Sequence, residues 1–212
     1  MTGPAARERV ESLRRRLAGE GFSGYIQPRA DEHQGEFVPP RAERLAWLTG
    51  FTGSAGLAVV LADKAALFTD GRYALQAARE VDGNVFEIIE TPGAAIAGWI
   101  ADNLRAGERL AYDPWLITVA RAKKYKAACR RAGGELAPIE TNPVDALWED
   151  QPAPPAAPIR PHDLAFTGKT SAAKRAAIAK SLIEGGGGAT VLSAPDSIAW
   201  LLNVRGDDVP FS

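Results

Sequence analysis

The chain has 212 residues, of which 46% are hydrophobic and 24% are charged, a composition typical of soluble globular proteins. Its 25 basic and 26 acidic residues nearly cancel and form no long block of one sign, which excludes an electrostatic footprint for non-specific binding to nucleic acid or anionic membranes. No apolar run approaches the roughly 20 residues of a membrane helix. From the charge balance and the lack of such a run together, we expect a cytoplasmic protein whose partners include neither nucleic acid nor membrane.

Helical and strand-like patterns alternate over the first 150 residues. Val10, Leu13 and Leu17 fall at helical spacing and predict an amphipathic opening helix. Strands are then predicted around 25–26 and over 57–62, 65–69, 85–89, 109–113 and 135–139, and helices over 41–50, 71–81, 94–105 and 118–132. Strands that alternate with helices of about 10–15 residues indicate an α/β fold, with a mixed β-sheet flanked by helices.

A proline-rich segment divides the chain. Residues 149–161 hold five prolines and few groups that could pack, so we expect an extended spacer and assign the linker to 151–161. Residues 1–150 then form an N-terminal α/β domain. From 162 to 212 the pattern restarts, with helices over 171–185 and 196–202 and a strand over 189–194. About 50 residues with one complete strand cannot close a core, so this second α/β unit is expected to be incomplete.

Several short motifs favour structural interpretations. Gly-Lys-Thr at 168–170 lacks the earlier glycine of a phosphate-binding loop, and Thr170 or Ser171 is better explained as a helix N-cap. The glycine run 185–188 follows a helix and precedes a strand, the reverse of a phosphate cradle. Cys129, the single cysteine, is expected to be a small buried thiol. The turn "FTGSAG" is expected to need Gly53 and Gly56 for backbone freedom.

Chemistry-bearing side chains gather in the loop "DEHQGEF" at 31–37. A histidine among carboxylates could ligate a metal, but the only other histidine, His162, directly follows the proline-rich segment. We therefore favour a loop in which His33 and Glu36 orient each other, beside a site. No motif of a catalytic metal, thiol or serine centre occurs, and no catalytic residue is expected in this chain.

The stretch "TDGRY" at 69–73 leaves two interpretations open. Asp70 and Gly71 are typical of a turn or helix entry, and Asp70 could cap the following helix. Arg72 would then lie in the first helical turn, the unfavourable end for a cation. Arg72 is either part of ordinary turn structure, or its guanidinium binds a carboxylate outside the hairpin that the strands 57–62 and 65–69 form.

The segments "FTGSAGLAVV" and "ALFTDGRYALQAAREV" resemble the N-terminal domain of Xaa-Pro aminopeptidases, the creatinase/prolidase-like metallopeptidases. The resemblance extends through "DEHQGEFVPPRAERLAWLTGFTGSAG", "AYDPWLIT", "NPVDALWEDQP" and "DSIAWLLNVRGDDV". It covers most of the chain in the order of the family, and it is closest to the longer, three-domain, cytosolic type.

The resemblance implies the non-catalytic N-terminal part of a hydrolase that removes the residue before a proline in second position. In the family, a third domain holds two divalent metals, usually manganese, and mediates most of the homodimer. That domain is not matched by this sequence, so no metal ligand is assigned here. The resemblance implies that Arg72 binds the peptide substrate and that His33, Glu36, Asp70 and Tyr73 lie near the site. A stand-alone peptide-binding or regulatory module with this fold is the alternative.

Overall fold

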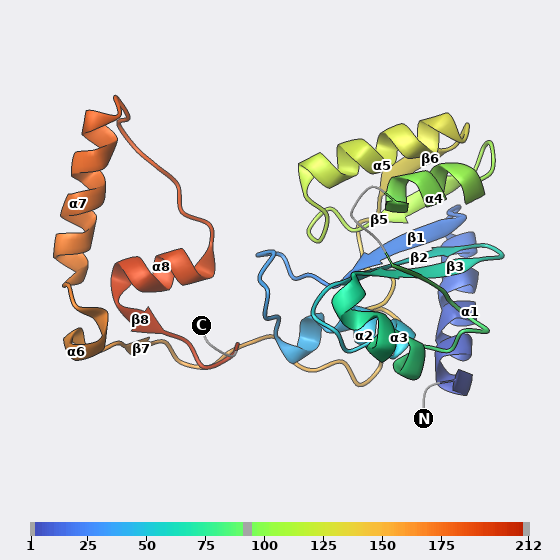
Figure 1. The fold of residues 1–212 in the computed structure, drawn as a ribbon, viewed down its shortest axis with the longest axis horizontal. Helices are drawn as coiled ribbons and strands as arrows, with labels where there is room; N and C mark the ends of the chain where they lie inside the picture. Colours follow the sequence, from blue (N-terminus) through green and yellow to red (C-terminus); the bar gives the residue numbers. More distant parts are fainter. Residues whose placement is uncertain (1–2, 91–94, 210–212) are drawn as a thin grey trace.

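A computed structural model describes residues 3–90 and 95–209 as two units joined by an extended segment (Figure 1). The helices of the first unit are α1 (Gly3–Gly19), α2 (Arg44–Thr49), α3 (Ala74–Glu80), α4 (Ala95–Asn103) and α5 (Val119–Arg131), with the short 3₁₀ helices η1 (Pro40–Ala42) and η2 (Gly71–Tyr73). Its strands are β1 (Gly24–Pro28), β2 (Gly56–Leu61), β3 (Ala65–Thr69), β4 (Glu87–Glu90), β5 (Arg109–Tyr112) and β6 (Glu135–Pro138).

These six strands form one mixed sheet in the order β4-β3-β2-β1-β5-β6. β2 pairs antiparallel with both β1 and β3, whereas the β1–β5, β5–β6 and β3–β4 pairs are parallel. Five strands therefore run in one direction, and their carboxyl ends meet at a single edge of the sheet. The predicted α/β class with a mixed sheet is confirmed.

Alternating side chains divide the core into two layers. Along β2, Ala58 and Val60 pack on the face covered by α1, α2 and α3, whereas Leu57, Val59 and Leu61 pack on the face covered by α4 and α5 (Figure 1). The two-residue period of a strand places successive side chains on opposite faces, so both faces of this apolar strand are buried.

The predicted opening helix is confirmed, because Val10, Leu13 and Leu17 are all buried in the first layer. The helix predicted over 41–50 is interrupted, since η1 ends before α2 begins; Gly50 ends α2 with a left-handed φ of 83°. The helix predicted over 71–81 is likewise split into η2 and α3. Ala94, the first residue of another predicted helix, lies outside the described residues.

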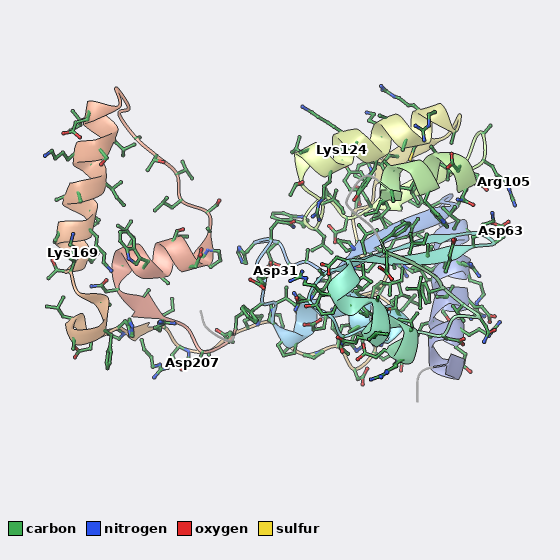
Figure 2. The ribbon with its side chains drawn as sticks, viewed as in Figure 1. Asp31, Asp63, Arg105, Lys124, Lys169 and Asp207 are labelled. Carbon is green, nitrogen blue, oxygen red and sulfur yellow. The ribbon has the colours of Figure 1, made fainter. Side chains whose placement is uncertain are left out.

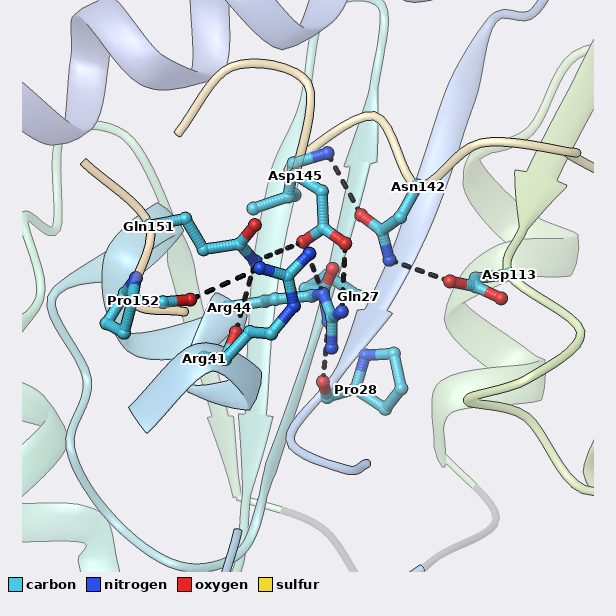
Figure 3. Close-up of polar contacts among 10 residues, drawn as sticks. Gln27, Pro28, Arg41, Arg44, Asp113, Asn142, Asp145, Gln151 and Pro152 are labelled. Atoms are coloured by element: carbon cyan, nitrogen blue, oxygen red, sulfur yellow. Dashed lines mark hydrogen bonds and ion pairs between the residues drawn. The ribbon is translucent and has the colours of Figure 1, made fainter. Parts of the chain in front are cut away.

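A polar network fastens the end of the first unit to α2 (Figure 3). Asp145 accepts hydrogen bonds from Nε and Nη2 of Arg44 at 2.6 and 2.9 Å. Gln151 Nε2 donates to Asp145 Oδ1 at 2.6 Å and to the Arg41 carbonyl at 3.1 Å, and Arg41 Nη1 donates to the Pro152 carbonyl at 3.2 Å. The chain is therefore held to the first unit up to the start of the proline-rich segment.

The second unit contains β7 (Arg160–Pro161), α6 (Leu164–Thr167), α7 (Ser171–Glu184), α8 (Pro195–Leu202) and β8 (Val204–Arg205). It lies apart from the six-stranded sheet (Figure 1). β7 and β8 pair antiparallel, so the last two residues of the predicted linker form a strand. Thr170 caps α7 as expected, with its side chain accepting a hydrogen bond from the Ala173 amide.

The strand predicted over 189–194 is wrong. These residues form neither helix nor strand, and Val191 is 91% exposed. A strand is stabilised by backbone hydrogen bonds to a neighbour, and the only β-pairing within the described part of this unit joins β7 to β8. Several large apolar side chains of the unit are also exposed, among them Phe166, Ile183 and Trp200.

Candidate functional site

The candidate site begins where β3 leaves the sheet. Thr69 ends β3, and Asp70 caps η2 by accepting a hydrogen bond from the Arg72 amide at 3.0 Å. The Asp70 carboxylate also accepts from Arg72 Nε at 3.0 Å and from Arg72 Nη2 at 2.8 Å. The expected cap is confirmed, and the same carboxylate holds the guanidinium in a bidentate pair.

This pair is exposed and electrostatically matched. The Arg72 side chain is 70% exposed and that of Asp70 is 34% exposed. The hydrogen bond from the Arg72 side chain is the main cause that lowers the pKa of Asp70 below its usual value. The hydrogen bond to Asp70 correspondingly raises the pKa of Arg72, and the negative charge of Glu36 adds to that effect. Among the described residues, Arg72 Nη1 has no hydrogen-bond partner, so one edge of the guanidinium remains available.

Tyr73 fixes the base of this hairpin end. Its hydroxyl lies 2.6 Å from Ser54 Oγ, and its ring packs edge-on against Phe51 with centroids 5.8 Å apart. The Arg72 guanidinium carbon lies 5.4 Å from the centre of the Tyr73 ring, within the range of a cation–π contact. Arg72 therefore packs on a tyrosine that is itself held in place by Ser54 and Phe51.

Gly53 and Gly56 are required for close packing rather than for backbone freedom, because neither has a positive φ. A Cβ at Gly53 would lie 2.3 Å from Phe51 Cζ and 2.8 Å from Tyr73 Cδ1. A Cβ at Gly56 would lie 2.8 Å from Leu45 Cδ2. The turn "FTGSAG" thus leaves room for the aromatic pair beneath the hairpin end.

The loop 31–37 is held by Asp31, which sequence reasoning did not single out for this role. Asp31 Oδ1 accepts hydrogen bonds from the amides of His33 and Gly35, both at 3.1 Å. His33 Nε2 lies 3.9 Å from Glu32 Oε1, and no hydrogen bond or ion pair within the described ranges joins His33 to Glu36. Between these two residues the loop turns through a left-handed residue at Gln34, with a φ of 57°.

The structure thus brings Asp70, Arg72 and Tyr73 together, with Glu36 close enough for its charge to act on Arg72. His33 makes its contacts within its own loop. Within the ranges 3–90 and 95–209, no group of three or more His, Cys, Asp or Glu side chains could hold a metal ion. The described residues do not fit a metal centre, and we derive no metal-dependent step from them.

A groove of about 1010 Å³ opens beside Asp70 at the carboxyl edge of the sheet. Its walls come from the turn before β2, the end of β3, and the facing sides of α4 and α5. Ligands of open α/β sheets commonly bind outside the carboxyl ends of the strands. Sequence reasoning missed this groove; the only signal was the helical spacing of basic residues along α5.

Two family models define the class of the protein. Residues 9–147 match the model of the creatinase/prolidase N-terminal domain, and residues 150–212 match a second model with the same description. The chain belongs to the creatinase/prolidase N-terminal domain family. Among the described residues, no helix is both long and apolar enough to cross a membrane.

Two relatives that match nearly the whole chain are named as aminopeptidases. The chain is 42% identical over 211 residues to aminopeptidase P2 of Arabidopsis thaliana, a match that covers 97% of this chain. An X-prolyl aminopeptidase of Caenorhabditis elegans, a cytosolic enzyme with a di-nuclear active site, has a TM-score of 0.85 at 29% identity over 97% of this chain. This chain spans about a third of these relatives, 30% of the first and 36% of the second.

A shorter match concerns the first unit. The isolated N-terminal domain of a cytoplasmic peptidase of Mycobacterium tuberculosis H37Rv has a TM-score of 0.51 at 25% identity. The match covers 66% of this chain and 98% of that domain.

Proposed function

We propose that this chain is the N-terminal, non-catalytic part of a Xaa-Pro aminopeptidase, a hydrolase that removes the first residue of peptides with proline in second position. The observation that carries the proposal is the 42% identity over nearly the whole chain to an aminopeptidase P2 of which the chain spans 30%. In this proposal the chain shapes the substrate cleft and supports assembly of a homodimer in the cytoplasm.

The chemistry of hydrolysis is assigned to a part of the parent enzyme outside this chain. Two divalent metal ions, manganese in our proposal, would activate water there. The di-nuclear active site of the C. elegans neighbour supports this assignment. The residues of this chain would bind and orient the peptide.

Arg72 is proposed as the residue that contacts the peptide substrate. Nε and Nη2 are directed by Asp70, so the guanidinium plane is set before a peptide arrives. The available Nη1 edge can donate to a peptide carbonyl or carboxylate remote from the cleaved bond. In this proposal Asp70 and Tyr73 are positioning residues. The negative charge of Glu36 would limit how much negative charge a peptide can carry where it meets Arg72.

The proposed domain division is 1–150, a linker at 151–161, and the start of a second related domain at 162–212. Two family models that meet between residues 147 and 150 support the first boundary. The exposed apolar side chains of α6, α7 and α8 support the incompleteness of the second unit, since a finished domain would bury them.

Activity of the purified chain tests the proposal. We expect no release of the first residue from a Xaa-Pro peptide by the 212-residue chain with added Mn²⁺, and metal-dependent release by a parent enzyme that contains it. Metal-dependent release by the chain alone would contradict the non-catalytic assignment. A parent protein without any peptidase activity would favour a peptide-binding or regulatory module instead.

A further inference from the structure

The groove beside Asp70 carries an unbalanced positive charge. Four cationic side chains line it, Arg29, Arg121, Lys124 and Arg131, against the single carboxylate of Asp70. Asp70 is already engaged by Arg72, and Arg29 is engaged by Glu43 at 3.2 Å. The three cations on α5 are therefore the ones whose charge is not neutralised.

No carboxylate of the described ranges lies within ion-pair distance of Arg121, Lys124 or Arg131, although acidic residues make up 26 of the 212 positions. The helix itself holds no acidic residue. Spacings of three and seven residues place these side chains on one side of α5, which is the side that lines the groove. Lys124, labelled in Figure 2, belongs to this row.

The floor of the groove is apolar. Leu57 and Phe68 reach it from the sheet, Ile96 and Ala97 from α4, and Ala128 from α5. A cationic rim above an apolar floor suits a ligand that presents carboxylates to one side and aliphatic groups to the other.

We propose that this groove binds an acidic peptide segment in an extended conformation. Arg121 and Arg131 are ten residues apart on α5, about 15 Å at a helical rise of 1.5 Å per residue. An extended peptide covers that length with about four or five residues. A small single anion reaches only part of such a row, whereas alternate side chains of an acidic strand reach its whole length. The site rests on the groove and its charges, independently of the role assigned to Arg72.

The experiment measures binding of fluorescein-labelled hexaglutamate to the 212-residue chain by anisotropy at low ionic strength, with hexaglutamine as the neutral probe. The groove variant replaces Arg121, Lys124 and Arg131 with Gln. The control variant replaces Lys123, Lys126 and Arg130 with Gln; these residues are exposed on the same helix but do not line the groove. Both variants lose equal charge, and both reduce repulsion among the cations of α5, so folding is expected to persist.

We expect hexaglutamate to bind and hexaglutamine not to bind. We expect the groove variant to weaken the affinity for hexaglutamate about tenfold, since it removes three exposed charge pairs that are each weak. The control variant should change it less than about twofold. Equal weakening by both variants, or no binding of hexaglutamate, overturns the proposal. Tripolyphosphate or a single-stranded oligonucleotide that binds in place of hexaglutamate, and loses affinity only in the groove variant, overturns it in favour of a phosphate ligand.

Discussion

The ion pair between Arg44 and Asp145 provides the sharpest prediction about stability. Its side chains are only 11% and 22% exposed, and two hydrogen bonds at 2.6 and 2.9 Å join them. Burial acts to lower the pKa of Arg44, but the hydrogen bonds and charge of Asp145 raise it overall. Asp145→Ala would leave this guanidinium charged, largely buried and without its carboxylate. Breaking a buried pair costs about 3–5 kcal/mol, and the partial exposure of Asp145 lowers our expectation to about 2–4 kcal/mol.

Urea unfolding followed by far-UV circular dichroism measures this loss, with the free energy of unfolding taken at constant m-value. The near-UV signal of the stacked Trp47 and Trp148, 5.8 Å apart, reports on the same region. Asp63→Ala is the matched control, because Asp63 pairs with Arg105 at the surface, where the two side chains are 48% and 64% exposed. The control should cost less than about 1 kcal/mol. Equal losses in the two variants would refute the argument that burial makes the first pair costly to break.

Three further outcomes are expected. Gly53→Ala should destabilise the chain by about 1–3 kcal/mol in the same urea assay, because its Cβ has no room, whereas Gly83→Ala, with open space around it, should be close to neutral; similar values for both would contradict the packing argument. Burial raises the pKa of Cys129 to about 11, so the native thiol should react with a disulfide reagent at pH 8 far more slowly than in urea. The contribution of this buried thiol to the free energy of unfolding is complete below its ordinary pKa of about 9 and should be lost as the pH rises from 9 to 11. Limited proteolysis should cut first within or after 149–161, and early cleavage inside 57–80 would count against the proposed domain division.

Much of the first unit could be predicted because its signals are local. Strands β2 and β3 are continuous apolar runs separated by the turn at Asp63 and Lys64, and the glycine at the end of α2 marks its C-terminus. The helix after β3 and its cap at Asp70 could be predicted, but the 3₁₀ form of its first turn, η2, could not. Helix periodicity cannot distinguish a 3₁₀ turn from an α turn over three residues.

The strand over 189–194 shows the opposite case. An apolar run indicates a strand only if a neighbouring strand is available, and that is a property of the whole fold. The pairing of His33 with Glu32 and the cationic groove were beyond the sequence for a related reason. Each depends on how a loop turns or on which helix face meets the sheet, and no local pattern determines either one.

The most direct test of the central claim compares kcat/KM for short and longer Xaa-Pro peptides in the parent enzyme with wild-type sequence, Arg72→Ala and Arg72→Lys. A bidentate, partly desolvated arginine contact contributes about 1.5–3 kcal/mol, so Arg72→Ala should lower kcat/KM for the longer peptides by about 10- to 150-fold and leave the shortest nearly unchanged. Arg72→Lys should not restore the loss, since the planar fork is absent. Arg105→Ala, at an exposed arginine that also pairs with an aspartate, is the control and should behave as wild type. Unchanged kcat/KM at every peptide length, or a fall in Tm large enough to explain the loss, would contradict the assignment of Arg72 to the substrate.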